Sequence, residues 1–109
     1  MPEHVDYVID AIRLDSTGSY IEKYRVQTAT WDEAKRRWII GSESKAWSAI
    51  EIVVAMYFGS VFKTLYNDNR GARKIGSLVE GAMSKTRNVY LRTNVSGTVA
   101  DNLENLPPF

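Results

Sequence analysis

The sequence predicts an α+β fold: a mostly antiparallel sheet in the order β-β-β-α-β-β-β, with one helix packed on one face. Three observations lead to this prediction. Residues 5–15 and 20–28 alternate in the strand manner around a turn, and residues 45–58 carry apolar side chains at helical spacing. Residues 74–81 and 87–93 form a second pair of strand-like runs. With 109 residues, the chain is expected to form a single domain, 1–109.

The first two strands are expected to form a hairpin. The segment 15–19 between them is rich in turn-forming residues and contains Gly18. Residues 30–35 follow as a turn or a single helical turn, because Thr30 and Glu33 have the spacing of a helix N-terminal capping box. A third strand is then predicted over 36–40.

The predicted helix spans Lys45 to Phe58, with Ser42 or Ser44 as its N-terminal cap. Gly59 suits its C-terminus, because glycine adopts the left-handed backbone conformation without steric cost. One apolar stripe is expected to face the sheet, formed by Trp47, Ile50, Val54 and Tyr57.

A further strand is predicted over 61–66, and residues 67–71 form a turn. Residues 74–81 and 87–93 then make a second hairpin. Gly76 and Gly81 lie inside its first arm and indicate a bulge or a close approach of two backbones.

The C-terminal segment carries apolar residues at every third position. Leu103 and Leu106 can enter the core within one helical turn, after which Pro107 and Pro108 end that turn. The segment is therefore predicted to be a structural clasp. The alternative is a free tail that binds a partner.

Several motifs of the chain resemble the bacterial and phage proteins grouped as domain of unknown function 3892. They are the run Tyr90-Leu91-Arg92-Thr93, the run Asp101-Asn102-Leu103 with Leu106-Pro107, the opening strand 7–13, and the 50–64 region with its helix, glycine and strand. The resemblance brings no catalytic residues. Because relatives occur in phage genomes, it implies an accessory factor of a phage or mobile element, or an inhibitor of a host complex.

Composition excludes several classes of protein. The net charge of +1 gives no general attraction to nucleic acid or to an anionic membrane. The absence of cysteine removes disulfides, thiolate metal ligands and cysteine nucleophiles. The polar N-terminus shows no targeting signal, and the longest apolar run has seven residues, 52–58. We therefore expect a soluble cytoplasmic protein that does not enter a membrane.

Catalytic and metal chemistry is not expected. His4 is the only histidine and lies near the chain terminus, where a general base would lack a rigid support. Asp6, Asp10 and Asp15 share one strand, but Asp10 and Asp15 point to opposite faces if that strand is regular. They are interpreted as ordinary solvated carboxylates, and the protein as a non-enzyme without cofactor or metal.

Two candidate binding regions remain. Residues 61–92 hold seven basic and two acidic side chains, a net charge of +5, and could bind a nucleic acid backbone or an acidic partner. A mixed polar face is the alternative that we favour. The second region combines Trp31 and Trp38 with the cations between them, Lys35, Arg36 and Arg37. A tryptophan beside cations could form a binding surface, or it could pack over a sheet edge and protect it.

The sequence thus predicts a protein-interaction module that binds another protein through a sheet edge or the tryptophan region. The alternative is a nucleic-acid-binding protein that uses the basic segment. The oligomeric state stays open. The candidate binding residues are Trp31, Arg36, Arg37, Trp38, Arg70, Arg73, Lys74, Lys85 and Arg87.

Overall fold

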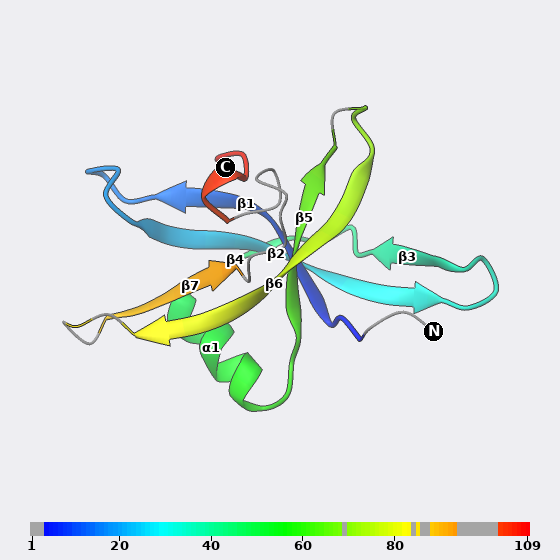
Figure 1. Ribbon diagram of the computed structural model, residues 1–109, viewed down its shortest axis with the longest axis horizontal. Coiled ribbons are helices and arrows are strands. Elements are labelled where there is room, and N and C mark those ends of the chain that lie inside the picture. Colours follow the sequence, from blue (N-terminus) through cyan, green and yellow to red (C-terminus); the bar gives the residue numbers. More distant parts are fainter. Residues whose placement is uncertain (1–3, 69, 84, 86–87, 94–102) are drawn as a thin grey trace.

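The computed structural model describes residues 4–68, 70–83, 85, 88–93 and 103–109. These residues form seven strands, one α-helix and one short 3-10 helix (Figure 1). The elements in chain order are β1 (Tyr7–Leu14), β2 (Ile21–Asp32), β3 (Arg37–Ile40), β4 (Lys45–Trp47), α1 (Ala49–Tyr57), β5 (Phe62–Asn67), β6 (Arg73–Met83), β7 (Val89–Thr93) and η2 (Leu103–Asn105).

The α+β class predicted from the sequence is confirmed. The strand order in the sheet is β3-β2-β1-β5-β6-β7, and β4 pairs separately with β2. The sheet is mostly antiparallel, with one parallel pair in which Tyr7–Ile9 of β1 lie beside 62–64 of β5. A parallel neighbour needs a crossover connection, and here the connection between β1 and β5 contains α1.

The first hairpin forms as predicted. Its turn is closed by the Asp15 carboxylate, which accepts hydrogen bonds from the backbone N–H groups of Ser19 and Tyr20. The Thr17 hydroxyl donates to the same carboxylate and is the main reason that the pKa of Asp15 is lowered.

The predicted turn at 30–35 is placed too early. Strand β2 continues to Asp32, because Thr30 and Trp31 pair with Ile39 and Trp38 of β3. The turn between the two strands occupies 33–36, and β3 begins one residue later than predicted.

The predicted helix start is also wrong. Lys45–Trp47 form β4, which pairs with Tyr24–Val26 of β2. The helix begins after Ser48, whose hydroxyl accepts from the Glu51 N–H while the Glu51 carboxylate accepts from the Ser48 N–H. Gly59, with φ +99°, ends it as predicted. No helix among the described residues is long and apolar enough to cross a membrane.

The helix face that packs on the sheet differs from the predicted one. Ile52 is fully buried, in the same core cluster as Ile9, Tyr24 and Phe62. By contrast Ile50, Val54 and Tyr57, which were predicted to face the sheet, are exposed. Both sides of this helix are apolar, so the spacing alone did not determine which side is buried.

Two isoleucines on the same helix test this orientation. Ile52→Ala should lower the unfolding free energy by about 2–5 kcal/mol, because it empties a fully buried site. Ile50→Ala, at a side chain 63% exposed, should change it by about 0.5 kcal/mol or less. Chemical denaturation of both variants provides the measurement. Equal losses, or a larger loss for Ile50→Ala, would contradict the observed face.

Of the two glycines in the second hairpin, Gly76 has the predicted role and Gly81 has a different one. Between the pairs Lys63–Leu78 and Leu65–Ile75, β6 has one residue more than β5, which places a bulge at Gly76 and its neighbour. At Gly81 a Cβ atom would lie 2.9 Å from a Val53 methyl carbon of α1, so this glycine makes room for a side chain rather than for a second backbone.

The C-terminal segment is packed against the core, as the clasp prediction required. Leu103 and Leu106 are 1% and 5% exposed. After them the chain runs beside β1, where the Ile12 N–H donates to the Pro107 carbonyl and the Phe109 N–H donates to the Ile12 carbonyl. This part of β1 lies beyond its pairing with β5, so the segment covers a strand edge that would otherwise be open.

Candidate functional site

The outward face of α1 and its C-cap residue carry four large apolar side chains, which we call the outer helix stripe. They are Ile50, Val54, Tyr57 and Phe58, exposed by 63%, 51%, 86% and 81%. The two aromatic rings contact each other edge to face, with centroids 5.5 Å apart. Isolated exposed apolar residues are ordinary, but several gathered on one element are typical of an interaction surface.

A groove adjoins this stripe at the N-terminal end of the helix. It has a volume of about 810 Å³, and we call it the β2–β7 groove because these strands form its two sides. Tyr20 and Tyr90 lie along it and are 64% and 43% exposed, and Ile50 belongs to both the groove and the stripe. The groove and the stripe therefore adjoin each other at Ile50.

Tyr24 connects the two sides of the groove. Its side chain is buried, and its hydroxyl forms a hydrogen bond with the Leu91 backbone of β7. Burial raises the pKa of Tyr24 to about 12. Strand β7 ends the strand order and pairs, among the described strands, only with β6. Its other edge is turned toward the groove.

The structure brings Trp31 and Trp38 together as a cross-strand pair, with ring centroids 5.5 Å apart. Trp38 packs on a second core cluster that includes Val8 and Leu65. The Trp31 indole N–H donates to Glu33. These contacts place the pair over the end of the sheet at edge strand β3. Arg36 and Arg37 lie beside it and are exposed.

The basic residues predicted to act together are separated. Arg70, Arg73 and Lys74 lie at the β5–β6 turn, whereas Lys85 follows the opposite end of β6. This strand has eleven residues, and at about 3.3 Å per residue it spans about 35 Å. Arg87 lies outside the described residues.

Several of the basic side chains have acidic partners. Arg73 bonds Asp10 at 3.0 Å, Lys74 bonds Asp68 at 3.3 Å, and Arg92 bonds Glu80 at 3.5 Å. These ion pairs reduce the positive charge that the segment offers to an anionic polymer.

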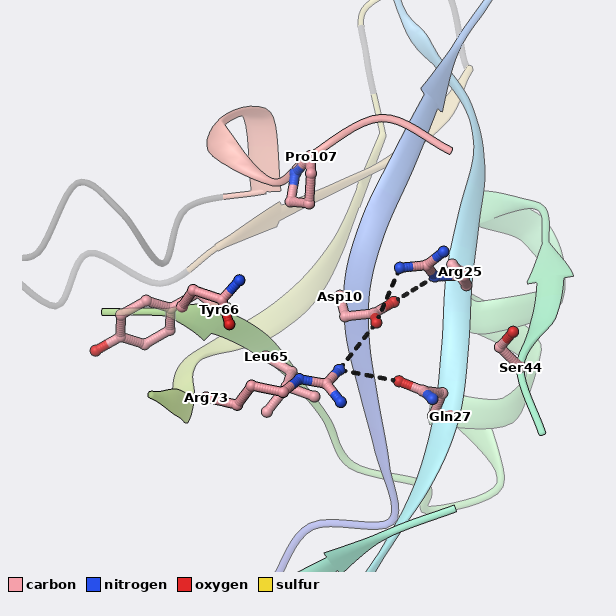
Figure 2. A pocket seen from close by; sticks show the side chains of 9 residues that line it. Asp10, Arg25, Gln27, Ser44, Leu65, Tyr66, Arg73 and Pro107 are labelled. Atoms are coloured by element: carbon pink, nitrogen blue, oxygen red, sulfur yellow. Dashed lines mark hydrogen bonds and ion pairs between the residues drawn. The ribbon is translucent and has the colours of Figure 1, made fainter. Parts of the chain in front are cut away.

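Asp10 was interpreted as a solvated carboxylate, and that interpretation is wrong. Its side chain is 10% exposed and accepts hydrogen bonds from Arg25 Nε (2.8 Å) and Nη2 (3.1 Å) and from Arg73 Nη2 (3.0 Å). Figure 2 shows the two guanidinium groups meeting the carboxylate from different sides. Arg73 also donates to Gln27, whose amide is held by the Gly41 carbonyl.

A shift in strand register explains why Asp10 takes this position. Ile9 pairs with Val26 and Ala11 pairs with Arg25, so Asp10 is the extra residue of a bulge in β1. The sequence signal was a lone aspartate between apolar residues of a strand, Ile9 and Ala11. Arg25 and Gln27 were not predicted as site residues. Their partners lie on other strands, and the sequence alone does not show how those strands pair.

Metal binding finds no support in the described part of the chain. No group of three or more histidine, aspartate or glutamate side chains there could hold a metal ion. His4 is 71% exposed and lies 2.8 Å from Asp6.

The fold and these surfaces define an α+β protein of one helix and a mixed seven-stranded sheet. Comparison with protein-family models, curated proteins and solved structures found no match.

Proposed function

We propose that this chain is a small, cytoplasmic, non-enzymatic module that binds a partner protein through the outer helix stripe and the β2–β7 groove. The observation that carries the proposal is the concentration of exposed large apolar side chains on α1 and beside it. Tyr57 and Phe58 contribute most, since they are the two most exposed of these side chains. Aromatic residues of this kind are the usual energetic anchors of protein interfaces.

The rigidity of the helix supports the same proposal. Its first turn is closed by the capping box of Ser48 and Glu51, and its last turn by hydrogen bonds from Gly59 and Ser60. The exposed side chains are therefore presented on a well-defined backbone, which lowers the entropy lost on binding.

Strand β7, the last in the strand order, adds a second means of recognition. Unpaired backbone groups at a sheet edge can pair with an extended segment of another protein, while side-chain pockets select its sequence. The β2–β7 groove offers such a pocket beside the edge. The family resemblance suggests a host complex as the partner of a phage or mobile-element factor.

Nucleic-acid binding is the weaker candidate. A phosphate backbone is bound by several cations acting along one surface. Here the cations are divided between the two ends of β6, and three of them have carboxylate partners.

The double substitution Tyr57→Ser with Phe58→Ser tests the proposal. A partner protein is captured from the native host, identified, purified and titrated against each variant by calorimetry. The double variant should bind about 10–100-fold more weakly, as expected when hot-spot aromatics are lost. Ile39→Ser, which removes an exposed apolar side chain near the tryptophan pair, should bind as the unsubstituted chain does.

Other outcomes would assign the interface to another part of the molecule. If Ile39→Ser abolishes binding and the double variant does not, the interface lies at the tryptophan pair. Retention of nucleic acid that weakens steeply with salt would favour the basic segment instead. Light scattering of the isolated protein detects association of two copies through the same surface.

A further inference from the structure

A hollow on the sheet is lined by Asp10, Arg25, Gln27, Tyr66 and Arg73, and has a volume of about 400 Å³. It is separate from the outer helix stripe and the β2–β7 groove, so its chemistry is independent of the proposed function. Figure 2 shows its side chains converging from β1, β2 and the β5–β6 region. Pro107 of the C-terminal segment lies at its border.

The hollow is positively charged. Its lining contains two arginines and a single carboxylate, so it has a net charge of +1. Asp10 already forms a two-point ion pair with Arg25. Asp10 also bonds Arg73, but one carboxylate can neutralise only one of the two guanidinium charges, so one positive charge in the lining has no carboxylate to balance it.

Both arginines have N–H donors that bond none of the other described residues. A guanidinium group has five N–H donors. Hydrogen bonds to other described residues use Nε and Nη2 of Arg25, but only Nη2 of Arg73. Among the described residues this leaves Nη1 of both arginines and Nε of Arg73 for a ligand. The two side chains are 37% and 48% exposed, so a ligand from solvent can reach them.

Both guanidinium groups are already held in place by neighbouring side chains. Asp10 holds Arg25 and Arg73 together, and Gln27 fixes Arg73 from a second side. The arginines stand on different strands of one sheet, β2 and β6. Their planar forks match the oxygen spacing of carboxylates and phosphates, and little freedom is lost when such an anion binds.

We propose that the Asp10–Arg25–Arg73 hollow is a binding site for an oxyanion, the phosphate or carboxylate group of a small ligand. An anion carrying one negative charge would neutralise the site. The volume suits a small molecule, since ligand sites in proteins measure about 300–1,000 Å³. In this arrangement Asp10 positions the arginines, and Arg73 provides most of the available donors.

The test is a titration of the full chain with inorganic phosphate at constant ionic strength, followed by the NMR signals of the arginine Nε–H groups. The Arg73 signal should shift along a saturable curve. Arg73→Gln should weaken phosphate binding by about tenfold or more, which corresponds to about 1.4 kcal/mol. Arg70→Gln is the matched control, because it removes the same charge from an exposed position on the nearby turn. It should change the affinity by about twofold or less.

A parallel titration with acetate distinguishes the source of the anion. Saturation with phosphate alone assigns the site to phosphate groups, and saturation with both assigns it to oxyanions in general. If Arg73→Gln fails to fold, Arg73→Lys takes its place in the test. It keeps the charge but loses the planar fork, so it should also weaken phosphate binding. Linear shifts with both anions, or equal losses for the Arg70 and Arg73 variants, would overturn the proposal.

Discussion

Deletion of residues 103–109 should lower the unfolding free energy by about 3–6 kcal/mol, because the free energy gained by burying the Leu103 and Leu106 side chains is lost. The deletion also removes the backbone hydrogen bonds that the segment makes with Ile12. A domain of ordinary stability has only about 5–15 kcal/mol in total, so the shortened chain should melt at a much lower temperature.

Point substitutions separate this effect from the loss of chain length. Leu103→Ala and Leu106→Ala should each cost about 2–3 kcal/mol in chemical denaturation, less than the deletion. If the segment acts only as a partner-binding tail, all three proteins keep the melting temperature of the full chain. That outcome would contradict the clasp.

Phe62→Ala should lower the unfolding free energy by about 3–5 kcal/mol. Phe62 is fully buried, and its ring contacts those of Tyr7 and Trp47, with centroid distances of 4.9 and 5.8 Å. The Tyr7 and Trp47 rings also contact each other, at 5.2 Å. The substitution leaves a cavity where β5, β1 and β4 meet, next to the parallel pair of β1 and β5.

Phe58→Ala is the matched control for this experiment. The same residue type is 81% exposed there, so the free energy of unfolding should change by about 0.5 kcal/mol or less. A similar loss in both variants would mean that Phe58 is covered in solution, either by the protein itself or by a second copy. Sedimentation of the two variants distinguishes these cases.

Local features of the sequence predicted most of the elements correctly. Both hairpins, the glycine at the helix end and the buried pair Leu103 and Leu106 follow from turn residues, periodicity and spacing. These signals act over a few residues, so the sequence alone reveals them. The pairing of Lys45–Trp47 with β2 depends on a distant strand, and the prediction extended the helix over it.

The candidate surfaces were harder to predict, for physical reasons that differ from site to site. Ile50, Val54 and Tyr57 of the outer helix stripe were predicted to face the sheet. Because α1 is apolar on both sides, only packing reveals which side the sheet covers. Asp10 was judged by the parity of a regular strand, which a bulge interrupts. The cations of 61–92 are close in sequence, but an extended strand separates them in space.

Site-specific photo-crosslinking in the native host is the most direct test of the interaction surface. Tyr57 is replaced by the photoreactive p-benzoylphenylalanine in one variant, and Lys35, on the β2–β3 turn, in another. The account predicts a discrete, protease-sensitive and nuclease-resistant adduct from position 57 and none from position 35. An adduct from position 35 without one from position 57 would contradict the assignment of the partner to the outer helix stripe.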